Sequence, residues 1–246
     1  MGFSVENRIA LVTGANRGIG KVIVETLLAK GAKKVYVGVR KLEAGKELAD
    51  KYPGKAVPIV IDLNDRTTIK AAAAQAKDVE LVVNNAGIAL VSKVLDDNAF
   101  ETLEQQFQVN VYGLLAMAQA FAPILKTNGG GAFAQLNSVV SLKSFGDVGT
   151  YSASKAASYS VTQSLREQLA GQGTLVVSVH PGPIATDMAA DAGFMEIAEP
   201  PSLVAEALVK AVANGEFHVF PDSMARQMWG AYEGFARNVI EPAASH

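Results

Sequence analysis

The feature that most constrains the fold of this chain is a repeated alternation of short β-branched runs with longer stretches rich in Ala and Leu. Alternation of this kind predicts a parallel sheet with right-handed crossovers and helices on both faces. We therefore expect an α/β protein with a doubly wound, mostly seven-stranded parallel sheet. The expected strands are 9–13, 34–39, 56–61, 81–84, 131–137, 175–180 and 217–220, and the expected helices are 18–30, 42–51, 66–77, 100–125, 151–170 and 203–213.

Length and composition favour a single domain over residues 1–246. Nearly half of the residues, 49%, are hydrophobic, which is enough for one substantial core. The chain has no cysteine, so disulfides and thiolate metal sites are excluded. The formal net charge is −2 and there is no basic run, so a nucleic-acid partner is not expected.

Other classes of site and location are also disfavoured. The first eight residues lack the basic and then apolar segment of a signal peptide, and no apolar run approaches the roughly 20 residues of a membrane helix. We therefore expect a cytoplasmic protein with no membrane partner. His180 and His218 lack a second ligand at a recognisable spacing, so no metal site is expected. The chain also lacks the G-x-S-x-G motif that would indicate a serine hydrolase.

A glycine-rich turn, Thr-Gly-Ala-Asn-Arg-Gly-Ile-Gly over positions 13–20, joins the first predicted strand to the first predicted helix. Glycines let the backbone turn sharply and approach a pyrophosphate closely. The helix that follows offers free N–H groups and the positive end of its dipole. An ordinary tight turn is the alternative, but the position of the motif favours a dinucleotide site. The candidate contacts are Gly14, Asn16, Arg17, Gly18, Ile19 and Gly20.

The glycines have the spacing G-x-x-x-G-x-G, and further motifs follow it in order. They are Asn84-Asn85-Ala86-Gly87, Asn110, Ser138, the Y-x-x-x-K pair Tyr151 and Lys155, Pro181-Gly182, and Thr186. Over roughly residues 5–220 this pattern resembles the short-chain dehydrogenase/reductase family. The resemblance implies a Rossmann-like fold, a nicotinamide cofactor, a small-molecule carbonyl or alcohol substrate, and a homodimer or homotetramer.

The end of the second predicted strand bears on the choice of cofactor. An acidic residue there would bind both ribose hydroxyls of NAD. Here Val39 is followed by Arg40, and Arg17 lies in the glycine turn. Two guanidinium groups can bind a 2′-phosphate through charge-assisted hydrogen bonds, with Lys41 as a weaker third candidate. We therefore expect NADP(H), with solvated surface arginines as the alternative.

The family resemblance implies further cofactor contacts. Asp62 and Leu63 are expected at the adenine, although a carboxylate here could instead belong to a helix N-cap, which Asn64 or Asp65 could also provide. Small side chains should line the cofactor after the fourth strand, while Asn84 ties neighbouring strands together. The remaining expected contacts are Asn85, Ala86, Gly87, Pro181, Gly182, Ile184 and Thr186.

Tyr151 and Lys155 are one helical turn apart, so their side chains share a face. A free phenol has a pKa of about 10, and a neighbouring ammonium lowers it. We expect Tyr151 to act as the general acid and base, with Ser138 holding the substrate oxygen. Ser141 is a rival to Ser138. By resemblance, Lys155 fixes the ribose, and Asn110 holds a water that links Lys155 to solvent.

The least regular stretch holds four prolines between positions 181 and 201 and follows a strand. We expect residues 183–201 to form a substrate lid. Residues 221–246 depart from the usual family pattern and form a C-terminal helical extension, in which Trp229 indicates a core or a subunit interface. Position alone suggests five pocket residues in addition to Ser138, namely Phe145, Val148, Met188, Phe194 and Met195.

These expectations combine into an NADPH-dependent reductase of ketones or aldehydes, reversible as an alcohol dehydrogenase. A non-catalytic NADPH-binding regulator is an alternative, but such a protein would not need the intact set of Ser138, Tyr151 and Lys155. An NAD-dependent epimerase or dehydratase could use the same tyrosine. The short chain and the position of Arg40 disfavour that alternative.

Overall fold

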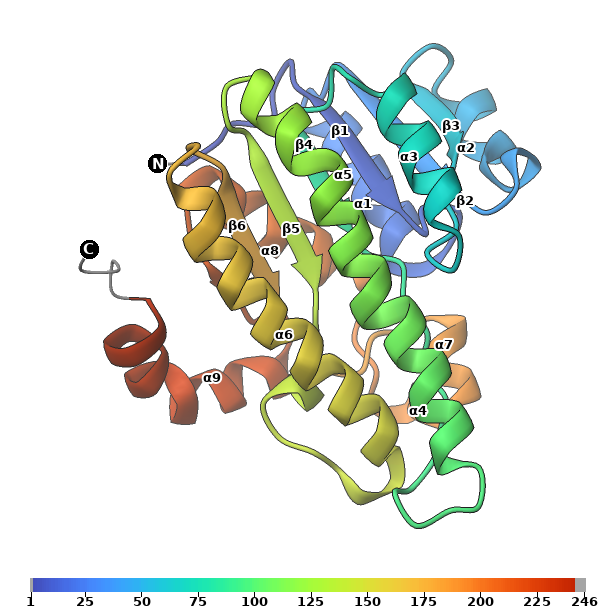
Figure 1. The fold of residues 1–246 in the computed structure, drawn as a ribbon, viewed down its shortest axis with the longest axis vertical. Helices are drawn as coiled ribbons and strands as arrows, with labels where there is room; N and C mark the ends of the chain where they lie inside the picture. The colour runs from blue at the N-terminus through green and yellow to red at the C-terminus, as the bar shows by residue number, and fades with distance from the viewer. Residues whose placement is uncertain (1, 242–246) are drawn as a thin grey trace.

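The computed structural model describes residues 2–241, and its centre is a seven-stranded parallel sheet in the order β3-β2-β1-β4-β5-β6-β7 (Figure 1). The doubly wound sheet predicted from the sequence is thus confirmed. The strand order reverses between β1 and β4, and in such sheets ligands bind at the carboxyl ends beside this point. The strands are β1 Ile9–Thr13, β2 Lys34–Val39, β3 Ala56–Val60, β4 Leu81–Asn84, β5 Ala132–Leu136, β6 Leu175–Val179 and β7 His218–Val219.

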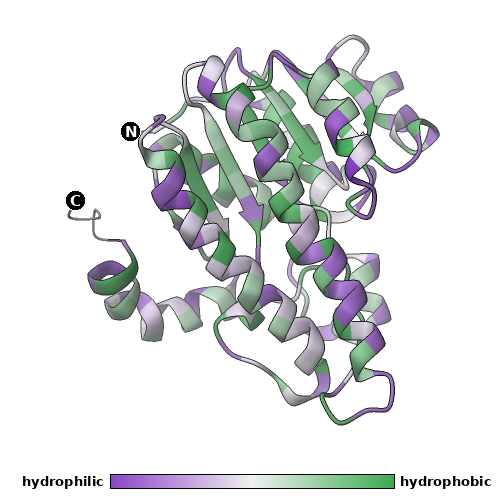
Figure 2. Ribbon diagram, in the orientation of Figure 1, coloured by the Kyte–Doolittle hydropathy of each residue, from purple (hydrophilic) through white to green (hydrophobic). Residues whose placement is uncertain are grey.

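Helices cover both faces of the sheet and form two cores. One face packs against α1, α2 and α8, and the other against α3, α5 and α6. The central strands β4 and β5 are buried along their whole length, and Figure 2 shows the sheet as mainly hydrophobic. The helices are α1 Gly18–Ala29, α2 Lys46–Lys51, α3 Arg66–Gln75, α4 Ala99–Phe107, α5 Gly113–Thr127, α6 Gly149–Ala170, α7 Asp187–Asp191, α8 Pro201–Asn214 and α9 Ser223–Phe235.

Three elements differ from the sequence prediction. The helix expected over 100–125 is divided by a π turn, Gln108–Tyr112, between α4 and α5. The helix expected over 42–51 begins as a 3-10 turn, Leu42–Gly45. The last strand is reduced to the two residues of β7, because only these two pair with β6.

The segment Ala99–Thr127 is long and apolar enough, by length and composition alone, to cross a membrane. However, half of its most apolar window is buried inside the protein. Its α5 part packs in the second core through Leu114, Met117 and Phe121, none of which is exposed. A core helix of this kind meets the same criterion of length and composition, so the segment is a core helix here.

Beyond β7 the chain continues into α9 and a π turn, Ala236–Ile240. In Figure 1 α9 projects beyond the sheet on the side of α6. Asp222 caps the helix by accepting a hydrogen bond from the Ala225 N–H. The predicted extension is therefore helical where the structure describes it, while residues 242–246 lie outside the described residues.

Candidate active site

The predicted functional residues follow the carboxyl ends of four neighbouring strands. Gly14 follows β1, Asn85 follows β4, Ser138 lies two residues after β5, and Pro181 lies two residues after β6. Since these strands are parallel and adjacent, the four segments meet at one edge of the sheet. This edge is where ligands bind in open α/β sheets.

The glycine turn has the shape of a phosphate cradle. Gly14 and Gly18 have φ angles of +61° and +52°, a backbone region that favours glycine. A Cβ on Gly20 would lie 2.3 Å from the Gly14 carbonyl oxygen, so the turn is closed to larger residues. Within the described chain, no side chain caps the first turn of α1. The free N–H groups of the α1 N-terminus therefore fit a pyrophosphate.

The segment after β4 lies directly against this turn. The Asn85 amide donates to the Thr13 carbonyl at 2.9 Å, and the Ala86 N–H donates to the Thr13 hydroxyl at 2.9 Å. Asn84 accepts from the Thr13 hydroxyl at 3.1 Å and donates to the Gln135 side chain at 2.7 Å. Asn84 thus ties β1, β4 and β5 together.

The two arginines predicted for the 2′-phosphate are both exposed. Arg40 follows the buried Val39 at the end of β2. Arg17 forms an ion pair of 3.0 Å with Asp187 at the start of α7, and both side chains are about two-thirds exposed. The guanidinium groups are therefore accessible to an anion, although at Arg17 the Asp187 carboxylate would compete with it.

At the predicted adenine side, the helix cap and the cofactor candidate are different residues. Asp65 caps α3 through the Thr67 N–H at 2.8 Å. Asp62 accepts from the Asn64 N–H at 2.9 Å within its own turn and is half-buried. Leu63 is 5% exposed and lies against Gly113 of α5, so its side chain belongs to the core. Only its backbone is left for a cofactor.

Tyr151 and Lys155 lie on α6 as predicted, with the Lys155 Nζ 5.9 Å from the centre of the Tyr151 ring. The Lys155 ammonium donates to the Leu136 carbonyl at 2.8 Å. Burial lowers the pKa of Lys155 to about 8. Burial also raises the pKa of Tyr151 to about 12, against the smaller lowering effect of the Ser138 hydroxyl. In the protein alone, desolvation therefore outweighs the lowering of the phenol pKa expected from the spacing.

Asn110 lies in the π turn and connects three segments of the site. Its side chain accepts from the Ile88 N–H at 3.0 Å and donates to the Ile88 carbonyl at 2.9 Å and the Ser154 hydroxyl at 3.0 Å. A Cβ on Gly87 would meet both Asn110 and the Lys155 Nζ, at 3.0 and 3.6 Å. Asn110 is therefore close to Lys155. Ser154, one residue before Lys155 on α6, thus holds the Asn110 amide.

The two rival serines have different surroundings. The Ser141 hydroxyl donates to the Ser138 carbonyl and also lies 3.0 Å from the His180 Nδ1, so it is held inside the turn. The Ser138 hydroxyl lies beside Tyr151 and donates to the Pro181 carbonyl at 3.3 Å. This arrangement supports the preference for Ser138.

Segments 13–20 and 181–186 approach each other across the end of the sheet. A Cβ on Gly18 would lie 3.1 Å from the Thr186 side chain. Thr186 caps α7, and its hydroxyl donates to the Ile184 carbonyl at 3.1 Å. Pro181 and Ile184 are buried and Gly182 is half-buried. The structure thus brings this segment of expected cofactor contacts to the glycine turn.

The family model of short chain dehydrogenases matches residues 8–196. The chain belongs to the short-chain dehydrogenase family. The resemblance predicted from the motifs is thereby confirmed.

Three similar proteins illustrate the relationship. An uncharacterized oxidoreductase of Staphylococcus epidermidis is 35% identical over 196 residues, which cover 78% of this chain and 84% of the relative. An NADPH-dependent 3-dehydrocapnine reductase of Ornithobacterium rhinotracheale is 34% identical over 191 residues, or 74% and 67% of the two chains. A short chain dehydrogenase of Burkholderia cenocepacia, solved in complex with NADP, has a TM-score of 0.85 at 34% identity and covers 98% of this chain and 100% of its own.

In this short-chain dehydrogenase the ends of the predicted lid are tied together. The Ala185 N–H donates to the Glu199 carbonyl at 2.9 Å, and the Glu199 N–H donates to the Pro183 carbonyl at 3.0 Å. The intervening residues form α7 and a 3-10 turn, Met195–Ile197. Among the pocket candidates, Val148 is only 8% exposed, so it offers little surface to a substrate. Phe145, Met188, Phe194 and Met195 are 36–49% exposed.

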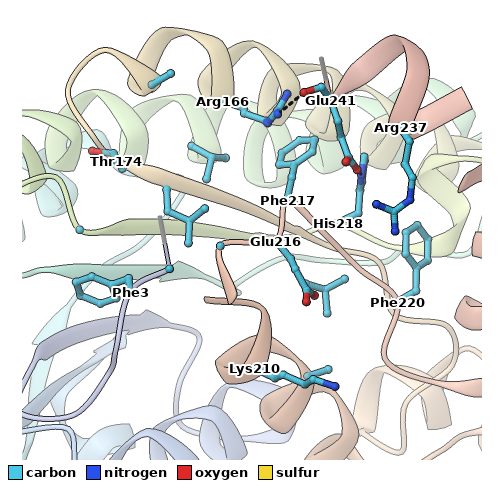
Figure 3. A pocket seen from close by; sticks show the side chains of 18 of the residues that line it. Phe3, Arg166, Thr174, Lys210, Glu216, Phe217, His218, Phe220, Arg237 and Glu241 are labelled. Atoms are coloured by element: carbon cyan, nitrogen blue, oxygen red, sulfur yellow. Dashed lines mark hydrogen bonds and ion pairs between the residues drawn. The ribbon is translucent and has the colours of Figure 1, made fainter. Parts of the chain in front are cut away.

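A separate hollow of about 1140 Å³ lies at the β7 edge of the short-chain dehydrogenase (Figure 3). Phe217, His218 and Phe220 line it, together with Arg166, which donates to the Glu241 carbonyl at 2.7 Å. None of the predicted catalytic or cofactor residues lines this hollow. It belongs to the junction between the sheet and the C-terminal extension. Over residues 2–241, no cluster of three metal-ligating side chains is found.

Proposed function

We propose that this short-chain dehydrogenase uses NADPH to reduce a ketone or an aldehyde to an alcohol, and that the reaction is reversible. The observation that carries the proposal is the arrangement of Ser138, Tyr151 and Lys155 at the carboxyl edge of the sheet. A phenol with a hydroxyl beside it and a buried ammonium on the same helix face is suited to moving a proton to a carbonyl oxygen.

The residues present fit NADP(H). The glycine turn and the uncapped N-terminus of α1 suit a pyrophosphate, and no carboxylate follows β2 directly. Arg17 and Arg40 would hold the 2′-phosphate. The NADP complex of the Burkholderia cenocepacia relative and the NADPH dependence of the Ornithobacterium rhinotracheale relative support this choice. When bound, the cofactor supplies the hydride that reaches the carbonyl carbon.

Ser138 and Tyr151 act on the substrate oxygen. When a substrate binds, the Ser138 hydroxyl would turn its single proton from the Pro181 carbonyl to this oxygen and orient the substrate carbonyl. The Tyr151 hydroxyl then donates its proton as negative charge develops on the oxygen. The phenol carries its proton at neutral pH, but burial raises its pKa to about 12 and makes it a weaker acid, so a neighbouring positive charge must offset this effect as the proton leaves.

Lys155 supports the charge that Tyr151 acquires. Burial lowers the pKa of Lys155 to about 8, so the side chain is mainly cationic at neutral pH and can stabilise the phenolate. Its bond to the Leu136 carbonyl holds the ammonium in place. Asn110, fixed by Ile88 and Ser154, would position the water through which the proton is replaced from solvent.

The proposal is tested by following NADPH and NADH oxidation by absorbance with a panel of ketones and aldehydes. Tyr151→Phe is the control, because it removes the proton and leaves the ring. We expect turnover with NADPH that is lost in this variant. Activity mainly with NADH would exclude the roles of Arg17 and Arg40. Tight NADPH binding without turnover of any carbonyl would favour a regulator, and a cofactor that co-purifies would favour an epimerase or dehydratase.

A further inference from the structure

Asp222 is a buried carboxylate in the segment between β7 and α9, with 1% of its surface exposed. One of its oxygens accepts from the Ala225 N–H at 2.9 Å and caps α9. The other accepts from the Gly182 N–H at 2.7 Å, forty residues earlier in the chain. The carboxylate therefore joins the start of the C-terminal helix to the turn that follows β6.

The bond to Gly182 leads directly to the predicted catalytic serine. The Gly182 N–H and the Pro181 carbonyl belong to one peptide group, whose oxygen accepts from the Ser138 hydroxyl at 3.3 Å. The same oxygen accepts from the Val139 N–H at 3.0 Å. One peptide thus has a carboxylate at its N–H end and the serine at its oxygen end. A charged acceptor both orients and polarises such a peptide.

The close approach also explains the glycine at position 182. A Cβ on Gly182 would lie 2.6 Å from Asp222 Oδ1 and 3.3 Å from the Met224 Cβ. The carboxylate therefore occupies the space that a side chain at this position would need. Glycine is required here by the contact with Asp222 and not by its backbone angles.

Helix capping alone does not account for a buried aspartate. Ser, Thr or Asn would cap α9 about as well, and burying a charge is costly unless it gains strong partners. A carboxylate differs because its two oxygens can serve two N–H groups that lie in different directions. Here those groups are Ala225 on α9 and Gly182 in the active-site turn.

Aromatic stacking fixes the same segment on both sides of Asp222. Phe220 stacks on His180 and on Trp229, with ring centres 4.9 Å apart in each pair. The His180 Nδ1 lies 3.2 Å from the Ser138 carbonyl oxygen. The residues that flank Asp222 are thus anchored to the turn that holds the serine.

We propose that Asp222 is a positioning residue for the reaction. It acts through the Pro181–Gly182 peptide, whose oxygen accepts from the Val139 N–H and the Ser138 hydroxyl, and it thereby sets the position of Ser138 beside Tyr151. The inference rests on the proposed carbonyl reduction. It assigns a role in the active site to the C-terminal segment, which lies outside the residues matched by the family model.

The first test separates positioning from capping. Asp222→Ser keeps an oxygen that can cap α9, but this oxygen cannot also reach Gly182, and Asp222→Ala removes both bonds. We expect kcat to fall about ten-fold or more in both variants, since small displacements of a reacting group are costly. The thermal midpoint of Asp222→Ser should stay near that of the unmodified protein. A kcat for Asp222→Ser equal to that of the unmodified protein would overturn the proposal.

The second test asks whether Asp222 acts through Ser138. In a Ser138→Ala background, with residual activity as the baseline, Asp222→Ser should lower kcat no further. If Asp222→Ser lowers kcat by the same factor with and without Ser138, the two residues act independently and the proposal is wrong.

Hydrogen exchange of a peptide containing the Gly182 N–H gives a readout independent of turnover. Asp222→Ser should accelerate it and leave peptides from α8 unchanged. Unchanged exchange at Gly182 would overturn the proposal even if the protein reduces no carbonyl, whereas faster exchange in an inactive protein would place the failure in the proposed reaction.

Discussion

The competition between Asp187 and a cofactor phosphate for Arg17 yields a prediction with a defined size. A charge-assisted hydrogen bond contributes about 1.5–3 kcal/mol. An exposed ion pair such as Arg17–Asp187 contributes about 1 kcal/mol or less, and Arg17 must give it up. The net contribution of Arg17 to NADPH affinity is then about 1 kcal/mol, or about five-fold. Among the residues that the structure describes, Arg40 has no such ion pair to lose, so we expect it to increase NADPH affinity by about ten-fold or more.

The variants Arg17→Ala, Arg40→Ala and Asp187→Ala test this reasoning. Their Kd values for NADPH and NADH are measured through Trp229, the single tryptophan of the chain. Both arginine variants should weaken NADPH binding and change NADH binding less than about two-fold, because NADH lacks the phosphate. Asp187→Ala should strengthen NADPH binding by up to about five-fold, since it frees Arg17.

Two results would refute this account. Equal weakening of NADH and NADPH by the arginine variants would show that these side chains do not bind the 2′-phosphate. An unchanged NADPH affinity in Asp187→Ala, together with a loss in Arg17→Ala, would show that the ion pair does not compete with the cofactor. Lys41→Ala is a matched control, because this neighbouring cation was the weaker candidate and should have the smallest effect.

Three further predictions concern the catalytic pair and the cap of α3. Tyr151→Phe should lower kcat by about 10²–10⁴-fold while the NADPH Kd, measured by fluorescence, stays within about three-fold. Burial lowers the pKa of Lys155 to about 8, so its charge is present below that pH and lost above it. The rate of reduction should therefore fall as pH rises through about 8, and a pH profile of Lys155→Met should lack this limb. Asp65→Ala removes the α3 cap and should cost about 1 kcal/mol in denaturant unfolding, with kcat unchanged.

The sheet could be predicted because each strand and helix carries its own local pattern. Buried runs such as β4 and β5 are mainly apolar, apart from the paired amides Asn84 and Gln135, and glycines mark the turns. The π turn could not be predicted in this way, because it inserts its extra residue into a helix that stays apolar on one face. The turn contains Asn110, an amide that is buried between Val109 and Val111.

Contacts between distant segments explain most of what the sequence left open. The spacing of Tyr151 and Lys155 is local, so the sequence alone predicts that their side chains share a helix face. The bond of Asp222 to Gly182 spans forty residues, and the sequence indicates only that an aspartate precedes a helix. The same limit applies to Val148, whose burial depends on its packing at the start of α6.

The pKa values of the catalytic pair show an effect that spacing alone does not include, namely the burial of each group in the protein alone. Two groups one helical turn apart suggest a phenol activated by a neighbouring cation, but a pKa also depends on how many atoms exclude water from each group. Burial raises the pKa of Tyr151 and lowers that of Lys155, so both shifts favour the uncharged forms. A phenol in this state holds its proton and is a weaker acid than a free phenol. Efficient transfer in either direction therefore needs cationic groups beside the phenol, such as the Lys155 ammonium, to bring its pKa nearer neutrality.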